Sequence, residues 1–388
     1  MDKLKYIPFH RASVGNEEIK MASKAIRSGW LTMGQMTVEF EDKFKAYTGA
    51  KYAIAVNSCT AALHLALEAI SLKEGDEVIV PAITFTATAE VVCYFKAKPI
   101  FVDVERDTLN IDHMKIESKI TSRTKAIIVV DYGGQPANYT EIKKIARKNK
   151  LFIIEDAAHT LPSWYKGRKV GTLADITCFS FYATKTLATG EGGMITTNNP
   201  VWARRMKIMR LHGINKDVWK RYDKGGNWYY EIVDAGYKYN TTDINSAIGI
   251  VQLKKLESMW RKRKAIAKIY GLGFKNIPEI IIPTIRNDRI TSWHLYVIKL
   301  SLDKLSIDRA EFIKMLLKEG ICVSVHFIPL YKQPFYKNKF KYTSVGFPNS
   351  EWAFKRIISL PIYPGMSGTK VKKVIKTIKK IVDNHKNV

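Results

Sequence analysis

The chain has few cysteines and no long hydrophobic run. Its four cysteines stand at positions 59, 93, 178 and 322, with no CxxC pair and no histidine at metal-ligand spacing, which argues against a disulfide framework and a zinc site. No uncharged apolar run reaches about 18 residues, and the N-terminus, MDKLKYIPFHRA, lacks the apolar stretch of a signal peptide. We therefore expect reduced thiols, no metal, no membrane span and a cytoplasmic location.

Acidic residues are scarce relative to basic ones. The 36 Asp and Glu residues face 63 Lys and Arg residues, which gives a net charge of +27 and raises the possibility of nucleic-acid binding. The positive charge is spread along the chain, however, with small clusters such as 261–264 and 371–388 instead of one basic arm. This pattern favours a lysine-rich solvated surface and no specific nucleic-acid partner. In an intermediate interpretation, part of the charge attracts a small polyanionic substrate.

Short apolar runs are plentiful between about residues 50 and 200. They alternate with helix-length segments, which indicates an α/β protein with an open, mostly parallel sheet covered on both faces. At 388 residues the chain is long enough for about two or three domains. The expected strands are 53–56, 77–80, 99–103, 126–131, 151–156, 176–181 and 194–197.

The C-terminal third has a different pattern. A helical stretch runs from about Thr242 to Phe274, and it is followed by a strand (HLYVIKL), a helix (DRAEFIKMLLKEG), a second strand (CVSVHF) and a final helix. This order predicts a smaller α+β domain. We expect a large domain with an N-terminal arm over 1–245 and a small domain with its linking helix over 246–388.

Polar and aromatic residues follow several of the predicted strands. Ligands bind outside the carboxyl ends of strands in such sheets. The segment 57–62 opens a helix, whose N-terminus suits a phosphate, although for this segment alone ordinary capping by Ser58 or Thr60 is favoured. No GxxxxGK[ST] motif occurs, so the segment is not a P-loop. Phe85, after the next strand, either lies on a planar ligand or covers the core.

A carboxylate and a lysine follow two later strands. Asp156 ends a buried strand, where its charge needs a cationic ring nitrogen or backbone N–H groups as a partner. His159 either faces the same ligand or is a packing residue. Lys185 is a candidate for Schiff-base chemistry or a lysine pointing to solvent. Together, a phosphate cradle, an aromatic face, a carboxylate and an amine are the contacts that pyridoxal 5′-phosphate (PLP) requires.

Three motifs carry a resemblance to a known family: EDAAH (155–159), CFSFYATKTLATGEGGM (178–194) and GYKYNTTDINSAIG (236–249). With them, the chain resembles over nearly its whole length the DegT/DnrJ/StrS sugar aminotransferases, which have the type I PLP-dependent, aspartate aminotransferase-like fold. The resemblance implies that Lys185 binds the cofactor aldehyde and is the catalytic residue. It also implies that Asp156 pairs with the pyridine nitrogen and that His159 lies near the cofactor hydroxyl.

The resemblance assigns the remaining contacts as well. Ser180 and Thr60, with the adjoining backbone of Ala61, match phosphate contacts, and Phe85 matches an aromatic residue that stacks on the ring. Asn240 matches an asparagine that reaches the phosphate from the neighbouring subunit, which implies a homodimer with shared active sites. His326 matches a position on the substrate side of the pocket.

The activity that the resemblance implies is transfer of an amino group from L-glutamate to C4 of a nucleoside-diphosphate 4-keto sugar. The exchange is ping-pong through pyridoxamine phosphate and serves polysaccharide, lipopolysaccharide or glycan amino-sugar synthesis. Amination of a 3-keto nucleotide sugar is the enzymatic alternative. A dehydratase branch replaces the lysine with histidine, so Lys185 argues against it. A basic nucleic-acid-binding or regulatory protein on the same fold is the non-enzymatic alternative, because a fold alone does not establish activity.

Overall fold

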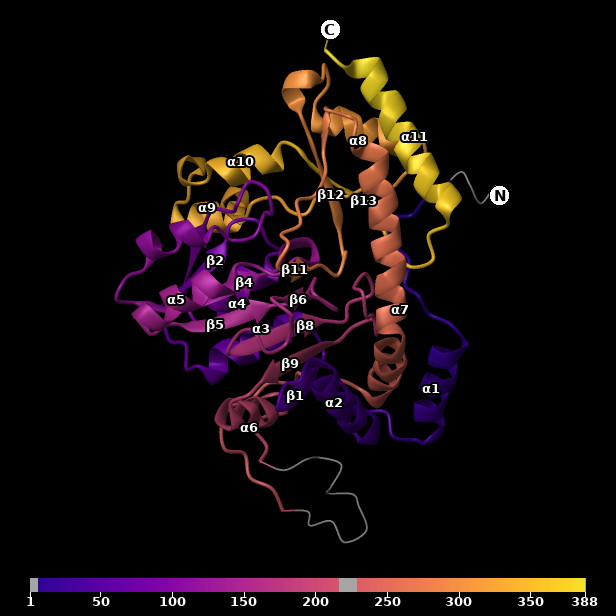
Figure 1. Cartoon of the computed structure of the whole chain (residues 1–388). Helices are drawn as coiled ribbons and strands as arrows, with labels where there is room; N and C mark the ends of the chain where they lie inside the picture. The colour runs from indigo at the N-terminus through magenta and orange to yellow at the C-terminus, as the bar shows by residue number, and fades with distance from the viewer. Residues whose placement is uncertain (1–5, 216–228, 388) are drawn as a thin grey trace.

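A seven-stranded sheet lies at the centre of the large domain in the computed structural model, which describes residues 6–215 and 229–387 (Figure 1). The strand order is β1-β9-β8-β5-β4-β2-β3. Only β9 runs antiparallel to its neighbours. The predicted mostly parallel α/β sheet is therefore confirmed, and each predicted run forms one strand: β1 (Tyr52–Val56), β2 (Glu77–Pro81), β3 (Lys98–Val102), β4 (Thr124–Val130), β5 (Phe152–Asp156), β8 (Ile176–Ser180) and β9 (Gly193–Thr197).

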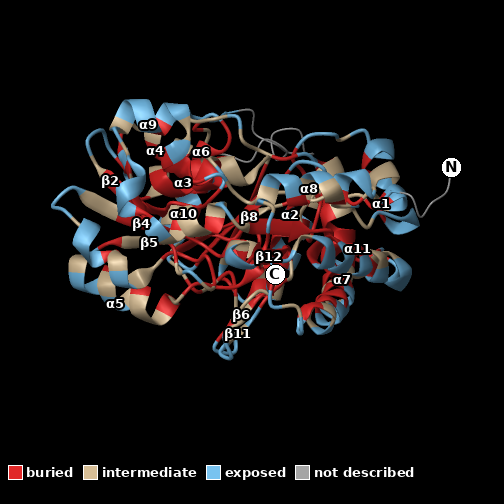
Figure 2. Cartoon of the chain, turned by 90° about the horizontal axis from the view of Figure 1, so that it is seen from above, coloured by how far each residue is buried: buried red, intermediate tan, exposed pale blue. Residues whose placement is uncertain are grey.

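Helices cover both faces of this sheet. Alternate residues of β1 enter different cores, with Ile54 and Val56 on one face and Ala53 and Ala55 on the other. The first face packs against α3 (Cys59–Ala69), α4 (Ala87–Tyr94) and α6 (Pro200–Met209). The second packs against α2 (Gln35–Thr48), α5 (Tyr139–Asn149) and the first half of α7 (Asp243–Phe274). Figure 2 shows the result, with buried strands between helices whose outer surfaces are exposed.

Helix α7 belongs to two hydrophobic cores. Its residues Leu256 and Met259 pack beneath the large sheet, whereas Tyr270 and Phe274 pack in the core of the small domain. In Figure 1 the helix accordingly runs from the large sheet to the small domain beside α11 (Gly368–His385). The two cores thus meet near the middle of α7, whereas the predicted domain boundary after residue 245 falls in the first turn of this helix. The division of the chain into domains at residue 245 stays a prediction.

The small domain is built on an antiparallel sheet in the order β10-β12-β13, covered by α8 and α11. The expected strand at 322–327 was wrong. Ile321 and Ser324 form only isolated bridges, with Ile7 and Ser359, so no continuous ladder supports a strand there, and β13 takes the third position instead. The remaining elements are α1 (Asn16–Arg27), β6 (Trp164–Tyr165), β7 (Arg168–Lys169), β10 (Ile280–Ile281), β11 (Arg289–Ile290), β12 (Tyr296–Leu300), α8 (Arg309–Lys318), α9 (Pro334–Phe340), α10 (Pro348–Phe354) and β13 (Ile357–Leu360).

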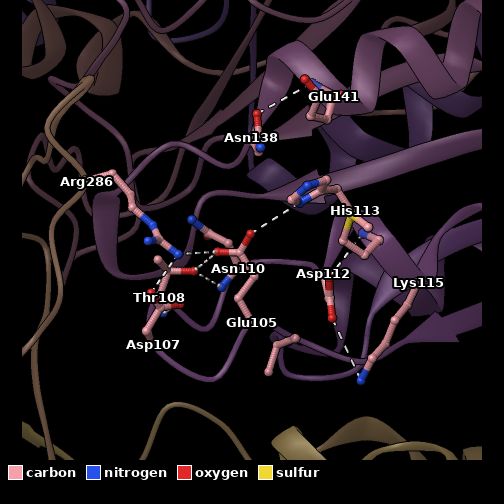
Figure 3. A network of polar contacts seen from close by, with 12 residues as sticks. Glu105, Asp107, Thr108, Asn110, Asp112, His113, Lys115, Asn138, Glu141 and Arg286 are labelled. Carbon is pink, nitrogen blue, oxygen red and sulfur yellow. Dashed lines mark hydrogen bonds and ion pairs between the residues drawn. The ribbon is translucent and has the colours of Figure 1, made fainter.

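A polar network joins the loop after β3 to the segment that follows α7 (Figure 3). Arg286 Nη2 lies 2.6 Å from Asp107 Oδ2, and the Thr108 hydroxyl donates to Glu105 Oε2 at 2.6 Å. His113 Nδ1 lies 3.3 Å from the other Glu105 oxygen. Despite these acidic and imidazole groups, no three His, Cys, Asp or Glu side chains within the described ranges are grouped as a metal site. Within the same ranges, every helix is too short or too polar to cross a membrane.

Candidate active site

The ends of three strands meet the start of α3 at one edge of the sheet. Asp156 ends β5, Ser180 ends the adjacent β8, and Ser180 pairs with Gly193 at the start of β9. Gly193 in turn lies against the backbone of Ser58, where a Cβ would stand 2.6 Å from the carbonyl. Only glycine fits this approach. The close contact brings Ser180 and the N-terminus of α3 to the same place.

The start of α3 has the geometry of an anion site. The Ser58 hydroxyl caps the helix by accepting from the Ala61 N–H at 3.0 Å. The N–H groups of Cys59 and Thr60 precede the intrahelical hydrogen bonds and carry the positive end of the helix dipole. Thr60 and Ser180 are both half-buried. The Ala61 amide is already bonded, so Thr60, Ser180 and the first N–H groups are the better candidates for a phosphate.

Asp156 is a buried carboxylate surrounded by neutral donors. Its Oδ2 accepts from the Thr88 hydroxyl at 2.8 Å, and its Oδ1 accepts from the Ala158 N–H at 3.2 Å. The Cys59 thiol lies 3.9 Å from Oδ1. Burial raises the pKa of Asp156, and the Thr88 and Ala158 bonds oppose that rise. No ion pair of the described residues includes Asp156, so its charge is compensated by dipoles and suits a cationic ligand atom.

Lys185 lies in a turn directly after β8, and its N–H donates to the Tyr182 carbonyl at 2.8 Å. Burial lowers the pKa of this half-buried lysine, while the charge of Asp156 raises it. A lowered pKa increases the neutral fraction of the amine, which is the nucleophilic form. Asp156 and Lys185 each influence the pKa of the other, in agreement with their positions at the ends of the adjacent strands β5 and β8.

A row of aromatic rings borders the same site. Phe85, which is 59% exposed, lies 5.9 Å from the Phe327 ring, which is stacked 6.0 Å from the His159 ring. The His294 ring also lies 4.5 Å from the His159 ring. The Gly133 N–H donates to His159 Nδ1 at 3.3 Å, so the neutral ring carries its proton on Nε2. Burial, together with Lys185 and His326, lowers the pKa of His159 and keeps the ring neutral.

His326 and Asn240 lie on different segments. The Nδ1 atom of His326 is 2.8 Å from the Ser359 hydroxyl, and the ring stacks on Phe9 at 5.4 Å. Burial and the charge of Lys185 lower the pKa of His326 to about 4. The Asn240 amide donates to Thr32 and Thr241, and its Oδ1 is buried with no hydrogen-bond partner among the described residues. None of these Asn240 contacts reaches Asp156 or Lys185.

The sequence reasoning missed several residues of the site. Thr88 and Cys59 contact Asp156 directly. Cys59 lies in the segment 57–62 but was expected near a phosphate and not near Asp156, and no local signal identifies Thr88. His10 and His294 interact electrostatically with Lys185. No local signal identifies these two, because they come from the N-terminal arm and the small domain.

Comparison with known proteins identifies the family. The model of the DegT/DnrJ/EryC1/StrS aminotransferase family matches residues 12–379. The chain belongs to this family. It is 51% identical over 98% of its length to the uncharacterized protein MJ1066 of Methanocaldococcus jannaschii, which is covered to 99%. It is 44% identical to the spore coat polysaccharide biosynthesis protein SpsC of Bacillus subtilis, with 97% of each chain covered.

The solved structures agree with this assignment. The putative sugar aminotransferase Spr1654 from Streptococcus pneumoniae in its PMP form superposes with a TM-score of 0.92 at 34% identity, covering 97% of this chain and 99% of that one. The same protein is also known in a PLP form. The protein is therefore a PLP-dependent aminotransferase with the type I, aspartate aminotransferase-like fold, and its structural neighbours are sugar aminotransferases.

The residues present fit this cofactor. The helix start beside Gly193 is a backbone cradle for the phosphate, Asp156 is a buried carboxylate without a cationic partner among the described ion pairs, and burial favours the neutral amine of Lys185. His159 keeps an Nε2–H available for the hydroxyl of the cofactor. Each of the groups that PLP requires thus has a counterpart at the edge where β5 and β8 end.

Proposed function

We propose that this aminotransferase transfers the amino group of L-glutamate to C4 of a nucleoside-diphosphate 4-keto sugar, for the synthesis of an amino sugar of a surface polysaccharide, lipopolysaccharide or glycan. The observation that carries the proposal is the joint placement of buried Asp156 and amine Lys185 beside the α3 cradle, with neutral His326 close to Lys185. The 44% identity to a spore coat polysaccharide biosynthesis protein supports the pathway class.

Four side chains of the protein have separate roles in the proposed reaction. PLP, when bound, supplies an aldehyde for amines and a ring that takes up electrons. Asp156 holds a proton on the ring nitrogen through its carboxylate. Lys185 would hold the cofactor through its aldehyde, and as a free neutral amine it would take the proton from the donor Cα as a general base. His159 would donate from Nε2 to the cofactor hydroxyl, and Phe85 would pack on the cofactor ring.

We propose that the sugar substrate binds in the region around His326. A pocket of about 690 Å³ opens beside it and is lined by aromatic residues that include Phe85, Phe327 and Tyr336. His326, neutral above a pKa of about 4, offers a hydrogen bond to a sugar hydroxyl or keto oxygen. The net charge of +27 favours an anionic nucleotide sugar.

The proposed enzyme is a homodimer with shared active sites. Thr60 and Ser180 hold the phosphate from one protomer, and Asn240 of the partner subunit completes the contact. The contact would use the Nδ2 amine of Asn240, which donates to Thr32 and Thr241 within the single chain and is the atom of this side chain that can donate to a phosphate oxygen. We place the reaction in the cytoplasm, in agreement with four cysteines that form no disulfide.

Product analysis tests the proposed reaction. The enzyme is incubated with ¹⁵N-labelled L-glutamate and a panel of UDP-, dTDP- and GDP-linked 4-keto and 3-keto sugars, and NMR locates the label. We expect nitrogen at C4 of one 4-keto sugar. Label at C3 would support the alternative 3-keto enzyme, and no labelled product from any of these sugars would contradict the proposal.

Subunit complementation tests the shared site. Lys185→Ala removes the amine of the active site, and Asn240→Ala removes the proposed phosphate contact. If Asn240 acts across the interface, mixing them places both changes in one site of each mixed dimer and leaves the other site intact. Activity should therefore reappear in the mixture. A mixture as inactive as either variant alone, at a stage when subunits have exchanged, would contradict sharing.

A further inference from the structure

Two threonines lie behind Asp156 in a line of hydrogen bonds that the proposed mechanism does not use. Thr84 lies in the loop after β2 and Thr88 in the first turn of α4, and both side chains are buried. Their hydroxyl oxygens are 2.7 Å apart, and the Thr88 hydroxyl is 2.8 Å from Asp156 Oδ2. The line begins in the loop that carries Phe85 and ends at the carboxylate.

The chemistry of the hydroxyl group gives this line a direction. A threonine hydroxyl has one hydrogen to donate, and an ionised Asp156 can only accept. Thr88 therefore donates to Asp156, and Thr84 must donate to Thr88. The opposite direction would leave the hydrogen of Thr84 without an acceptor, since Thr88 is the only hydrogen-bond partner of its hydroxyl in the described part of the chain.

The direction matters because every donor in the line stabilises the ionised carboxylate. The Ala158 N–H adds a donor at Oδ1, against the cost of burying the charge. The single hydrogen of the Cys59 thiol is shared between Oδ1 at 3.9 Å and the Cys178 carbonyl at 3.6 Å. A carboxylate stabilised in this way leaves the shared proton on the ring nitrogen of the cofactor. A less stabilised one takes the proton itself and weakens the ring as an electron acceptor.

We propose that Thr88, supported by Thr84, is a positioning residue that keeps Asp156 ionised and oriented toward the pyridine nitrogen. This inference rests on the proposed function, in which Asp156 faces that nitrogen. Thr88 touches neither cofactor nor substrate in this account and acts only through Asp156.

The structure supplies a matched control on the adjacent residue. The Thr177 hydroxyl donates to Glu155 Oε2 at 2.7 Å, and Thr177 is as buried as Thr88. Glu155 precedes Asp156 in β5, so its side chain points to the opposite face of the sheet. Thr177→Val therefore removes the same kind of bond from a carboxylate that does not face the cofactor.

The test is a pH titration of the visible absorption of the cofactor bound to Lys185, in the wild type and four variants. When the ring nitrogen lacks its proton, the ring withdraws less electron density from the Lys185 nitrogen bound to the cofactor. The pKa of that nitrogen is then higher. We expect Thr88→Val to raise the pH midpoint of the spectral change by about one unit, because a hydrogen bond to a charged group is lost. Thr84→Val should raise it less, Thr88→Ser should restore the wild-type midpoint, and Thr177→Val should lower the melting temperature alone.

The outcomes separate the two proposals. A Thr88→Val midpoint equal to that of the wild type, or an equal shift in Thr177→Val, would overturn the positioning role. If Thr88→Val does not fold, Thr84→Val decides the matter by the same readout. A wild-type protein that binds PLP without any visible band would overturn the proposed function itself, and the positioning role with it.

Discussion

Replacing Asp243 by alanine should destabilise the large domain strongly, although Asp243 lies outside the proposed catalytic residues. Its Oδ1 accepts from the N–H groups of Gly34 and Thr37 at 2.7 and 3.0 Å and from the Thr37 hydroxyl at 2.7 Å. Its Oδ2 accepts from the Met36 N–H at 3.1 Å. Helix α2 has no cap of its own, because Gly34 precedes it. Asp243, at the start of α7, therefore caps α2 from a distance.

The magnitude follows from the groups left without a partner. Each buried donor that loses its acceptor costs about 1–3 kcal/mol, and three backbone N–H groups and one hydroxyl are affected here. Water entering the vacated space offsets part of this cost. We expect a loss of about 3–5 kcal/mol in the free energy of unfolding, measured from the urea midpoint of tryptophan fluorescence. Asp243→Asn keeps one acceptor oxygen and should lose less.

Asp42→Ala is the matched control. Asp42 is exposed on α2, and within the described ranges its ion pair is with Lys45, at 2.7 Å. Exposed pairs of this kind contribute about 0–1 kcal/mol, so the urea midpoint should barely move. An Asp243→Ala variant that unfolded at the wild-type urea concentration, or an Asp42→Ala variant that was equally destabilised, would contradict a capping role for Asp243.

Three further outcomes are expected. Lys185→Ala should lower the rate of amino transfer by about three orders of magnitude or more, because the proton transfer loses its base. A variant that completed many turnovers in a product assay would contradict this. Burial raises the pKa of Asp103, but bonds from Ser350 and Lys115 outweigh it and lower the pKa. Ionised Asp103 therefore stabilises the folded protein at pH values above its pKa in the unfolded chain, about 3.9. This contribution is lost as the pH falls through its lower pKa in the folded protein. Asp103→Asn should therefore reduce the loss of unfolding free energy at acid pH. Finally, any DNA retention in a gel shift should disappear at physiological salt, whereas a persistent complex would support a nucleic-acid role.

The sequence predicted the large sheet because its strands are buried on both faces. Ile54 and Ala55 face different helical layers, so both must be apolar, and the run is visible without knowledge of its neighbours. The segment 322–327 (CVSVHF) is also rich in apolar strand-forming residues, yet Ser324 meets a partner at one point only. The composition of a segment does not reveal whether a neighbouring strand pairs with it along its whole length. The small-domain sheet was therefore predicted less well.

The site was predicted as far as its residues follow strands directly. Asp156 and Ser180 end adjacent strands, as their positions in the sequence suggested. The contacts of Thr88 and Cys59 with Asp156 depend on how α3 and α4 lie over β5 and β8, which follows from strand order and not from local pattern. His294 reaches His159 from the other domain, and no periodicity encodes that approach.

The most direct test of the central claim is the visible absorption of the purified protein with PLP, recorded before and after addition of L-glutamate and then of the keto-sugar panel. We expect a band that requires Lys185, is bleached by glutamate and is restored by one 4-keto nucleotide sugar. A band that forms but does not respond to glutamate would contradict the proposed donor. A bleached band that no keto sugar restores would contradict the proposed acceptor.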